Sequence, residues 1–84
     1  NQQKHGVSFA EAQTVFLDEY ARLLTDPDHS HQEERFLLLG LSEQARLLLV
    51  CHCYRQAGGV LRIISARKAN KAEQKQYEGF KDAR

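Results

Sequence analysis

The chain has 84 residues, a net charge of +1, 42% hydrophobic residues and 27% charged residues. This length fits one small domain, and this composition excludes a chain that is disordered throughout. No apolar run approaches the ~20 residues that cross a bilayer, so we expect one soluble, cytoplasmic domain over residues 1–84.

The first element that the sequence predicts is a helix. Ser8 and Glu11 have the spacing of a capping box, which predicts a helix from Ser8 to about Leu17. The polar residues 1–5 and Gly6 are typical of the end of a preceding helix. Apolar residues recur at helical spacing and should face the core: Phe9, Ala12, Val15 and Phe16.

The middle of the chain alternates apolar runs with turn-rich segments, which predicts strands joined by hairpins. Strands are expected over residues 20–24, 33–41, 46–54 and 60–67, with connections at 25–30, 42–45 and 55–59. Asn70 and Glu73 repeat the capping pattern and predict a C-terminal helix that runs toward Phe80. The fold class is therefore α+β, with a four-stranded, mostly antiparallel sheet and the first helix on its apolar face.

The predicted loops fix which residues pair across the sheet. Connections at 42–45 and 55–59 place Arg35 opposite His52 and His52 opposite Arg62, so these three residues should form one row on one face. The opposite face is expected to be the core: Phe36, Leu38, Leu47, Leu49, Cys51, Leu61 and Ile63.

This row suggests a binding site. Two guanidinium groups beside an imidazole attract anions, and Arg binds phosphate through two oxygens at once. The C-terminal quarter is also basic, which favours a local phosphate-binding surface. A surface ladder of Glu and Arg around a hydrogen-bonded histidine is the alternative, and a solvated helix face is the alternative for the basic segment.

Neither cysteine chemistry nor a metal site is expected. Cys51 and Cys53 lie two residues apart in a strand, about 6.5 to 7 Å, at or beyond the reach of a disulfide. His52 should face away from both, so the three residues do not form a metal site. Polar residues around Pro27 suggest either a metal-binding loop or, more simply, a flexible turn: Asp26, Asp28, His29 and His31.

Three segments together resemble the signature blocks of the BrnT family. They are KHGVSF (residues 4–9) followed by EA, DPDHS (26–30) followed by EERF (33–36) and Gly40, and RIISARKA (62–69). BrnT proteins are the toxin halves of bacterial type II toxin–antitoxin pairs. The resemblance implies a RelE-like fold and a ribonuclease that uses no metal or other cofactor. It also implies arrest of translation through cleavage of mRNA, free or on the ribosome, and neutralisation by a BrnA-type antitoxin.

Members of this family usually begin with a short strand and a longer helix before the first block. This chain starts inside that helix, so the first strand of the family is expected to be missing from it.

Cleavage of RNA without a metal needs a base for the 2′-hydroxyl, cations for the phosphate and an acid for the leaving oxygen. The expected phosphate-binding residues are Arg35, Arg62 and Arg67. The candidate proton carriers are His5, Glu34 and His52. Further RNA contacts are expected from Lys4, Glu33 and Lys68.

These candidates have structural alternatives. Lys4 and His5 can complement a helix C-terminus, the two glutamates can simply pair with Arg35, and Arg67 can bind backbone carbonyls. Arg62 and Arg67 are five residues apart, so in a regular strand their side chains point to opposite faces of the sheet. They reach one site only if a bulge or the strand end turns Arg67 around. A non-catalytic module that binds nucleic acid or protein through the same basic face is the alternative function.

Overall fold

The computed structural model describes residues 6–25, 35–54 and 59–83. The elements in these ranges are α1 (Phe9–Thr14), the 3-10 helix η1 (Val15–Leu17), β1 (Arg22–Thr25), β2 (Phe36–Leu41), β3 (Leu47–Tyr54), β4 (Leu61–Lys68) and α2 (Lys71–Asp82). Within them the strands form one antiparallel sheet in the order β1-β2-β3-β4. The α+β class and the four-stranded sheet are confirmed. None of the described helices is long and apolar enough to span a membrane.

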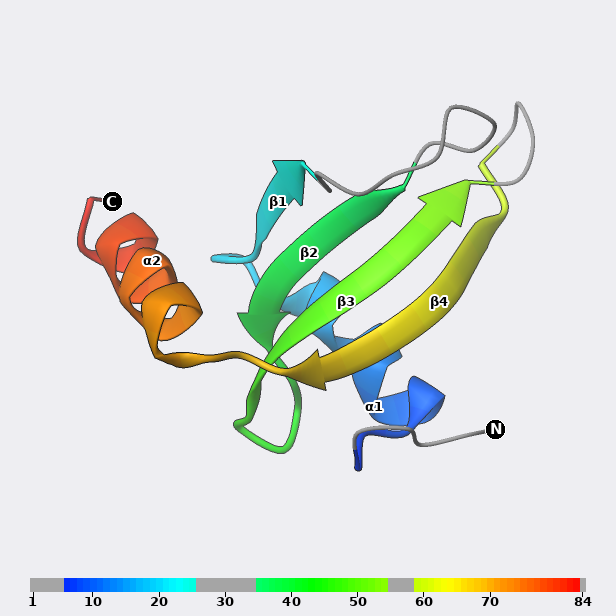
Figure 1. Ribbon diagram of the computed structural model, residues 1–84, viewed down its shortest axis with the longest axis horizontal. Helices are drawn as coiled ribbons and strands as arrows, with labels where there is room; N and C mark the ends of the chain where they lie inside the picture. Colours follow the sequence, from blue (N-terminus) through cyan, green and yellow to red (C-terminus); the bar gives the residue numbers. More distant parts are fainter. Residues whose placement is uncertain (1–5, 26–34, 55–58, 84) are drawn as a thin grey trace.

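The sheet has two different faces. Helix α1 lies behind the strands in Figure 1, whereas α2 lies beside one end of the sheet. We call the side that packs on α1 the α1 face; it carries Leu38, Leu48, Val50, His52, Ile63 and Ala66. We call the other side the α2 face; it carries Leu24, Leu37, Leu39, Leu49, Cys51, Ser65 and Arg67.

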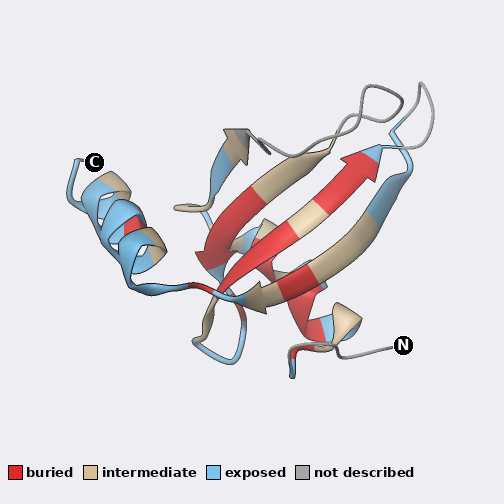
Figure 2. Cartoon of the chain, viewed as in Figure 1, coloured by how far each residue is buried: buried red, intermediate tan, exposed pale blue. Residues whose placement is uncertain are grey.

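The core of the α1 face is built by the predicted helix stripe. Ser8 caps α1 by accepting a hydrogen bond from the Glu11 N–H, as the sequence predicts. Ala12 and Val15 are fully buried against the sheet, and Phe16 packs beside them. Figure 2 shows buried residues along α1 and the central strands β2 and β3.

Helix α2 covers only part of the other face. Its N-terminus has the predicted capping box, because Asn70 and Glu73 each accept a backbone hydrogen bond from the other. Tyr77 is buried against a second cluster that includes Leu39 and Leu49. Farther from α2 along the strands, the α2 face carries half-buried side chains, among them Leu37 and Cys51. Helix α2 therefore leaves this part of the face uncovered.

The first hairpin differs from the predicted one by a single residue. Residues 42–46 connect the two strands, and Ala45 adopts a positive φ of 62°. Leu41 therefore pairs with Leu47, and His52 pairs with Phe36 instead of Arg35. The predicted pairing is wrong because a four-residue loop was assumed.

The second hairpin is also longer than predicted, and β4 contains a bulge. Near the turn Cys53 pairs with Arg62, whereas farther along Leu49 pairs with Arg67, with a shift of register between Cys51 and His52. The extra residue lies in β4, where Ile64 has no partner in the ladder. A bulge of this kind reverses the alternation of side chains. Arg62 and Arg67 therefore lie on the same face.

Gly40 provides a test of the packing between β2 and the segment of η1 and the residues that follow it. A Cβ at this position would lie 2.8 Å from Val15 Cγ1 and 2.9 Å from Ala21 Cβ. We expect Gly40→Ala to lower the free energy of unfolding by about 1 to 3 kcal/mol through overpacking, measured by urea denaturation. Gly79→Ala is the control, since nothing lies within 4 Å of a Cβ there and Ala in a helix should be neutral or stabilising. Equal stability of the two variants would contradict this packing.

Candidate active site

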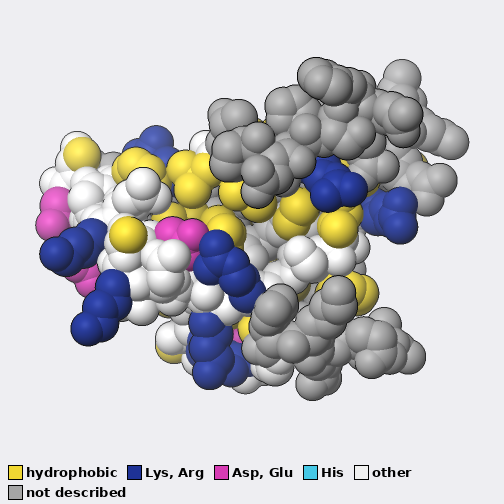
Figure 3. Space-filling model, viewed as in Figure 1, with side chains coloured by type: hydrophobic (Ala, Val, Ile, Leu, Met, Phe, Trp, Pro, Cys, Tyr) yellow, Lys and Arg dark blue, Asp and Glu magenta, His cyan; other side chains and the backbone are white. Residues whose placement is uncertain are grey.

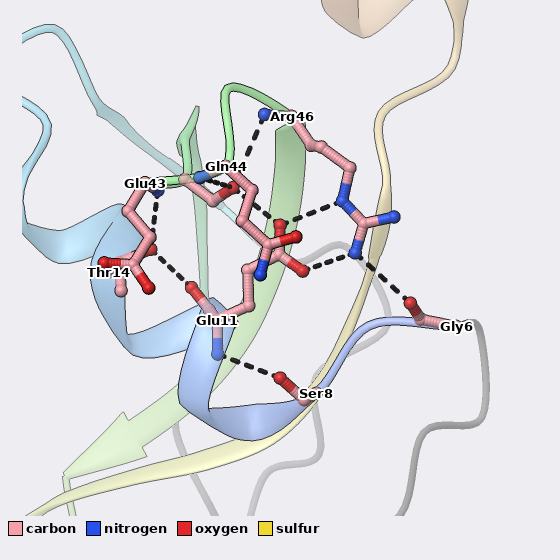
Figure 4. Close-up of polar contacts among 8 residues, drawn as sticks. Gly6, Ser8, Glu11, Thr14, Glu43, Gln44 and Arg46 are labelled. Carbon is pink, nitrogen blue, oxygen red and sulfur yellow. Dashed lines mark hydrogen bonds and ion pairs between the residues drawn. The ribbon is translucent and has the colours of Figure 1, made fainter.

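A partly buried ion pair on the α1 face ties the helix to the first hairpin (Figure 4). Glu11 is 3% exposed, and its carboxylate accepts hydrogen bonds from Arg46 Nη2 and, at 2.9 Å, from Arg46 Nε. The Ser42 hydroxyl donates to the same carboxylate at 2.6 Å. Arg46 also donates to the Gly6 carbonyl at 3.3 Å. The Glu11 carboxylate thus joins α1 to the first hairpin, and Arg46 joins the hairpin to Gly6 before α1.

The electrostatics of this cluster indicate a structural role. Hydrogen bonds from Arg46 hold the pKa of Glu11 below its usual value, although burial acts in the opposite direction. An ionised carboxylate whose acceptor sites are already occupied is poorly suited to proton transfer. The sequence identified Glu11 only as a capping residue and gave no role to Arg46, because nothing local connects them.

A second polar contact fixes α2. The Tyr77 hydroxyl donates to Asp18 Oδ2 at 2.6 Å, and the backbone N–H groups of Leu41 and Tyr20 donate to the same carboxylate. Burial alone would raise the pKa of Asp18, but these hydrogen bonds outweigh burial and lower it. Burial, together with the bond to Asp18, raises the pKa of Tyr77. Asp18 therefore stays ionised and anchors α2 to the sheet.

His52 does not lie beside the arginines. Its side chain is fully buried on the α1 face, where the rings of Phe16, Phe36 and Tyr54 surround it at centroid distances of 5.0 to 5.9 Å. Its Nδ1 lies 3.3 Å from the Val50 carbonyl. Burial lowers the pKa of His52, which keeps the imidazole neutral at pH 7. The predicted row of Arg35, His52 and Arg62 is therefore wrong at its centre.

The burial of His52 predicts a pH effect on stability. Its pKa is lower in the folded state than in the unfolded chain, so only the unfolded chain takes up this proton as the pH falls through about 6.5. Between pH 7.5 and 5.5 the free energy of unfolding should fall in the parent, and it should fall by about 1 kcal/mol less in His52→Leu. Urea denaturation at the two pH values measures both losses. The same loss in both proteins would show that His52 is protonated in the fold.

The three predicted phosphate-binding arginines share the α2 face. Arg62 is exposed and forms no side-chain hydrogen bond or ion pair with the described residues, and Arg67 lies farther along the same strand. Continuing the pairing of β2 with β3 by one residue places Arg35 opposite Cys53, which also pairs with Arg62. Each of the two loops is one residue longer than predicted, so both pairings shift by one residue in the same direction. Arg35 and Arg62 therefore still flank one residue of β3, which is Cys53 and not His52 as predicted.

The spacing of these arginines suits an extended anion. Arg35 and Arg62 are separated by two strand spacings, roughly 10 Å, so their long side chains can converge on one group. Arg67 lies roughly 16 Å from Arg62 along the strand. Figure 3 shows hydrophobic side chains across this face with Lys and Arg at both ends and no histidine among its described residues.

The other predicted site residues are placed elsewhere or fall outside the described ranges. Lys68 pairs with Leu48 on the α1 face, and its charge helps to lower the pKa of Glu11. It is therefore not beside Arg67 in the site. The remaining candidates, and the loop considered for a metal, lie outside the described residues: Lys4, His5, Asp26, Asp28, His29, His31, Glu33 and Glu34. In the described part of the chain, no three His, Cys, Asp or Glu residues group as metal ligands.

Comparison with protein families identifies the family of the chain. The family model described as the ribonuclease toxin BrnT of type II toxin–antitoxin systems matches residues 1–73. A search of curated proteins finds no match. The match includes the whole sheet and ends inside α2, so it covers all three arginines.

Proposed function

Because the chain belongs to the BrnT family of ribonuclease toxins of type II toxin–antitoxin systems, we propose that it cleaves RNA and thereby arrests translation. The observation that supports this proposal best is that Arg35, Arg62 and Arg67 lie on the α2 face. We call the part of the α2 face that carries these three residues the arginine face. Guanidinium groups at fixed positions stabilise the charge that develops on a phosphate during cleavage. The half-buried apolar side chains between them offer a surface for bases.

The proton carriers of the proposed reaction are His5 and Glu34. Glu34 directly precedes Arg35 in the chain, and Arg35 lies at the edge of the arginine face. His52 has no part in the proposed chemistry, because a buried neutral imidazole on the opposite face cannot exchange protons with a ligand there. We expect Glu34→Gln and His5→Ala to lower the cleavage rate, and His52→Leu to leave it close to the parent value.

The experiment is incubation of the purified protein with RNA in the presence of EDTA. Cleavage products with 2′,3′-cyclic phosphate ends are the expected result, because attack by the 2′-hydroxyl needs no metal ion. Cleavage that stops when EDTA is added would contradict the metal-independent reaction. Binding of RNA without cleavage would instead support the alternative of a non-catalytic module that uses the same face.

Membership of a type II toxin family implies an antitoxin partner, and we propose a protein of the BrnA type that covers the arginine face. Cationic and apolar side chains side by side suit an acidic, partly apolar segment of a partner. Co-expression with a BrnA-type antitoxin should restore growth and give a stable complex. Growth arrest that persists with no complex would contradict this partner.

A further inference from the structure

Arg67 is held more rigidly than a surface arginine normally is. Its Nη1 and Nη2 donate to the two oxygens of Glu73, each at 2.9 Å, and Nη1 also donates to the Lys68 carbonyl at 3.1 Å. Three hydrogen bonds from two nitrogens fix the plane of the guanidinium group. The edge of the guanidinium group that is formed by Nη1 and Nη2 is thus occupied by the Glu73 carboxylate.

The other edge of the same guanidinium group is open. The Nε–H and the second N–H of Nη2 have no hydrogen-bond partner among the described residues, and the side chain of Arg67 is 40% exposed. A guanidinium group presents two roughly parallel N–H bonds on this edge as well, and a phosphate can accept both. One arginine can therefore bind a carboxylate and a phosphate at the same time.

Glu73 is itself fixed by the start of α2. Its Oε1 accepts the Asn70 N–H at 2.9 Å, while its own N–H donates to Asn70 Oδ1 at 2.8 Å. Only 16% of the Glu73 side chain is exposed. The hydrogen bonds from Arg67 lower the pKa of Glu73 although burial opposes them, so the carboxylate is charged at neutral pH. The position of Arg67 is thus set by a helix N-terminus rather than by a flexible side chain.

We propose that Glu73 is a positioning residue, which holds Arg67 so that its open Nε and Nη2 edge binds a backbone phosphate of the RNA. This inference rests on the proposed ribonuclease function. Five residues of strand separate Arg67 from Arg62, roughly 16 Å, so Arg67 binds a different phosphate of the strand from the one held by Arg62. Glu73 does not contact the RNA and acts only through Arg67.

The first test measures kcat and KM for RNA cleavage by Glu73→Gln. A neutral amide cannot accept two N–H groups from Arg67, so the guanidinium loses its fixed plane, and misplacement of a catalytic contact costs up to about a hundred-fold in rate. We expect kcat to fall about ten-fold or more. KM should stay the same or decrease, because a negative charge near the RNA is removed.

Asn70→Ala is the control for the stability of α2. It removes the other half of the capping box but leaves both hydrogen bonds between Glu73 and Arg67, so kcat should stay near the parent value. Arg67→Lys, which keeps the charge but cannot bind Glu73 and phosphate bidentately, should resemble Glu73→Gln. A Glu73→Gln protein with the parent kcat, or an Asn70→Ala protein with an equal loss, would overturn the positioning role.

A second measurement does not depend on cleavage. The NMR signal of the Arg67 Nε–H is followed while a 2′-O-methyl oligonucleotide, which cannot be cleaved, is added to the parent protein. We expect this signal to shift in the parent and to shift much less in Glu73→Gln. If the parent fails to cleave RNA but the signal shifts, the proposed function fails and the phosphate-binding role of Arg67 is supported. An unchanged signal at saturating oligonucleotide would overturn the inference.

Discussion

Arg62→Ala is expected to lower the rate of RNA cleavage by about a hundred- to a thousand-fold. Arg62 is exposed on the α2 face and forms no side-chain hydrogen bond or ion pair with the described residues, so its charge is available to a phosphate. Loss of one charge-assisted contact to a transition state typically costs about 2.7 to 4 kcal/mol. The free energy of unfolding should change by less than about 1 kcal/mol, as for most surface substitutions. Rates are measured with a labelled RNA, and stability by urea denaturation.

The control for this prediction is Lys75→Ala. Lys75 is an exposed cation of α2, and its removal changes the net charge by the same amount without touching the sheet. Its cleavage rate should stay close to the parent rate. If Arg62→Ala and Arg35→Ala both cleave RNA at the parent rate, the site lies elsewhere. An equal loss in Lys75→Ala would mean that only the overall charge matters.

Arg46→Met is expected to destabilise the fold and to lower the midpoint of urea denaturation clearly. The substitution keeps the apolar length of the side chain but leaves the Glu11 carboxylate buried without its partner, and such breakage of a buried ion pair is costly. The double variant Glu11→Gln with Arg46→Met should recover much of this loss, since no buried charge is left unpaired. Urea denaturation of the three proteins gives the comparison.

The pH dependence of this effect has a definite sign. The pKa of Glu11 is lower in the fold than in the unfolded chain because Arg46 donates to it. The ion pair therefore contributes its full stability above about pH 4.3, the usual value for Glu, and loses it as the pH falls through the lower folded value. The difference between the parent and Arg46→Met should shrink over that acidic range. A difference that stays constant from neutral pH to pH 3 would contradict the role of the pair.

Local patterns in the sequence were sufficient for the elements of the fold. Ser8 and Asn70 are capping residues as predicted, because a cap depends on the three residues that follow it. The apolar runs predicted the strands within one to three residues of their observed ends, with the largest difference at the start of β2. The burial of Ala12 and Val15 follows from helical spacing alone.

These local patterns did not predict the register of the sheet correctly. The first loop is longer because Ala45 adopts a positive φ, which residues other than Gly, Asn and Asp seldom do. The bulge near Ile64 has no glycine to mark it. The sequence did show that Arg62 and Arg67 could share a face only through such a bulge or a turn at the strand end, and the bulge is present.

The ion pair of the α1 face was missed for a different reason. Glu11 has the sequence position of a capping residue, and Arg46 lies 35 residues away. No local pattern relates two residues at that distance. The same limit applies to His52, whose place in an aromatic pocket follows from the sheet register and from Phe16 on η1.

The arginine face is tested most directly by NMR of methyl groups during titration with an uncleavable 2′-O-methyl oligonucleotide. Leu24 and Leu37 report on the open part of the α2 face, whereas Val15 and Val50 report on the core of the α1 face. We expect large shifts for the first pair and small shifts for the second, and loss of the shifts in Arg62→Ala. Shifts confined to Val15 and Val50 would place the RNA on the other face and contradict the proposed site.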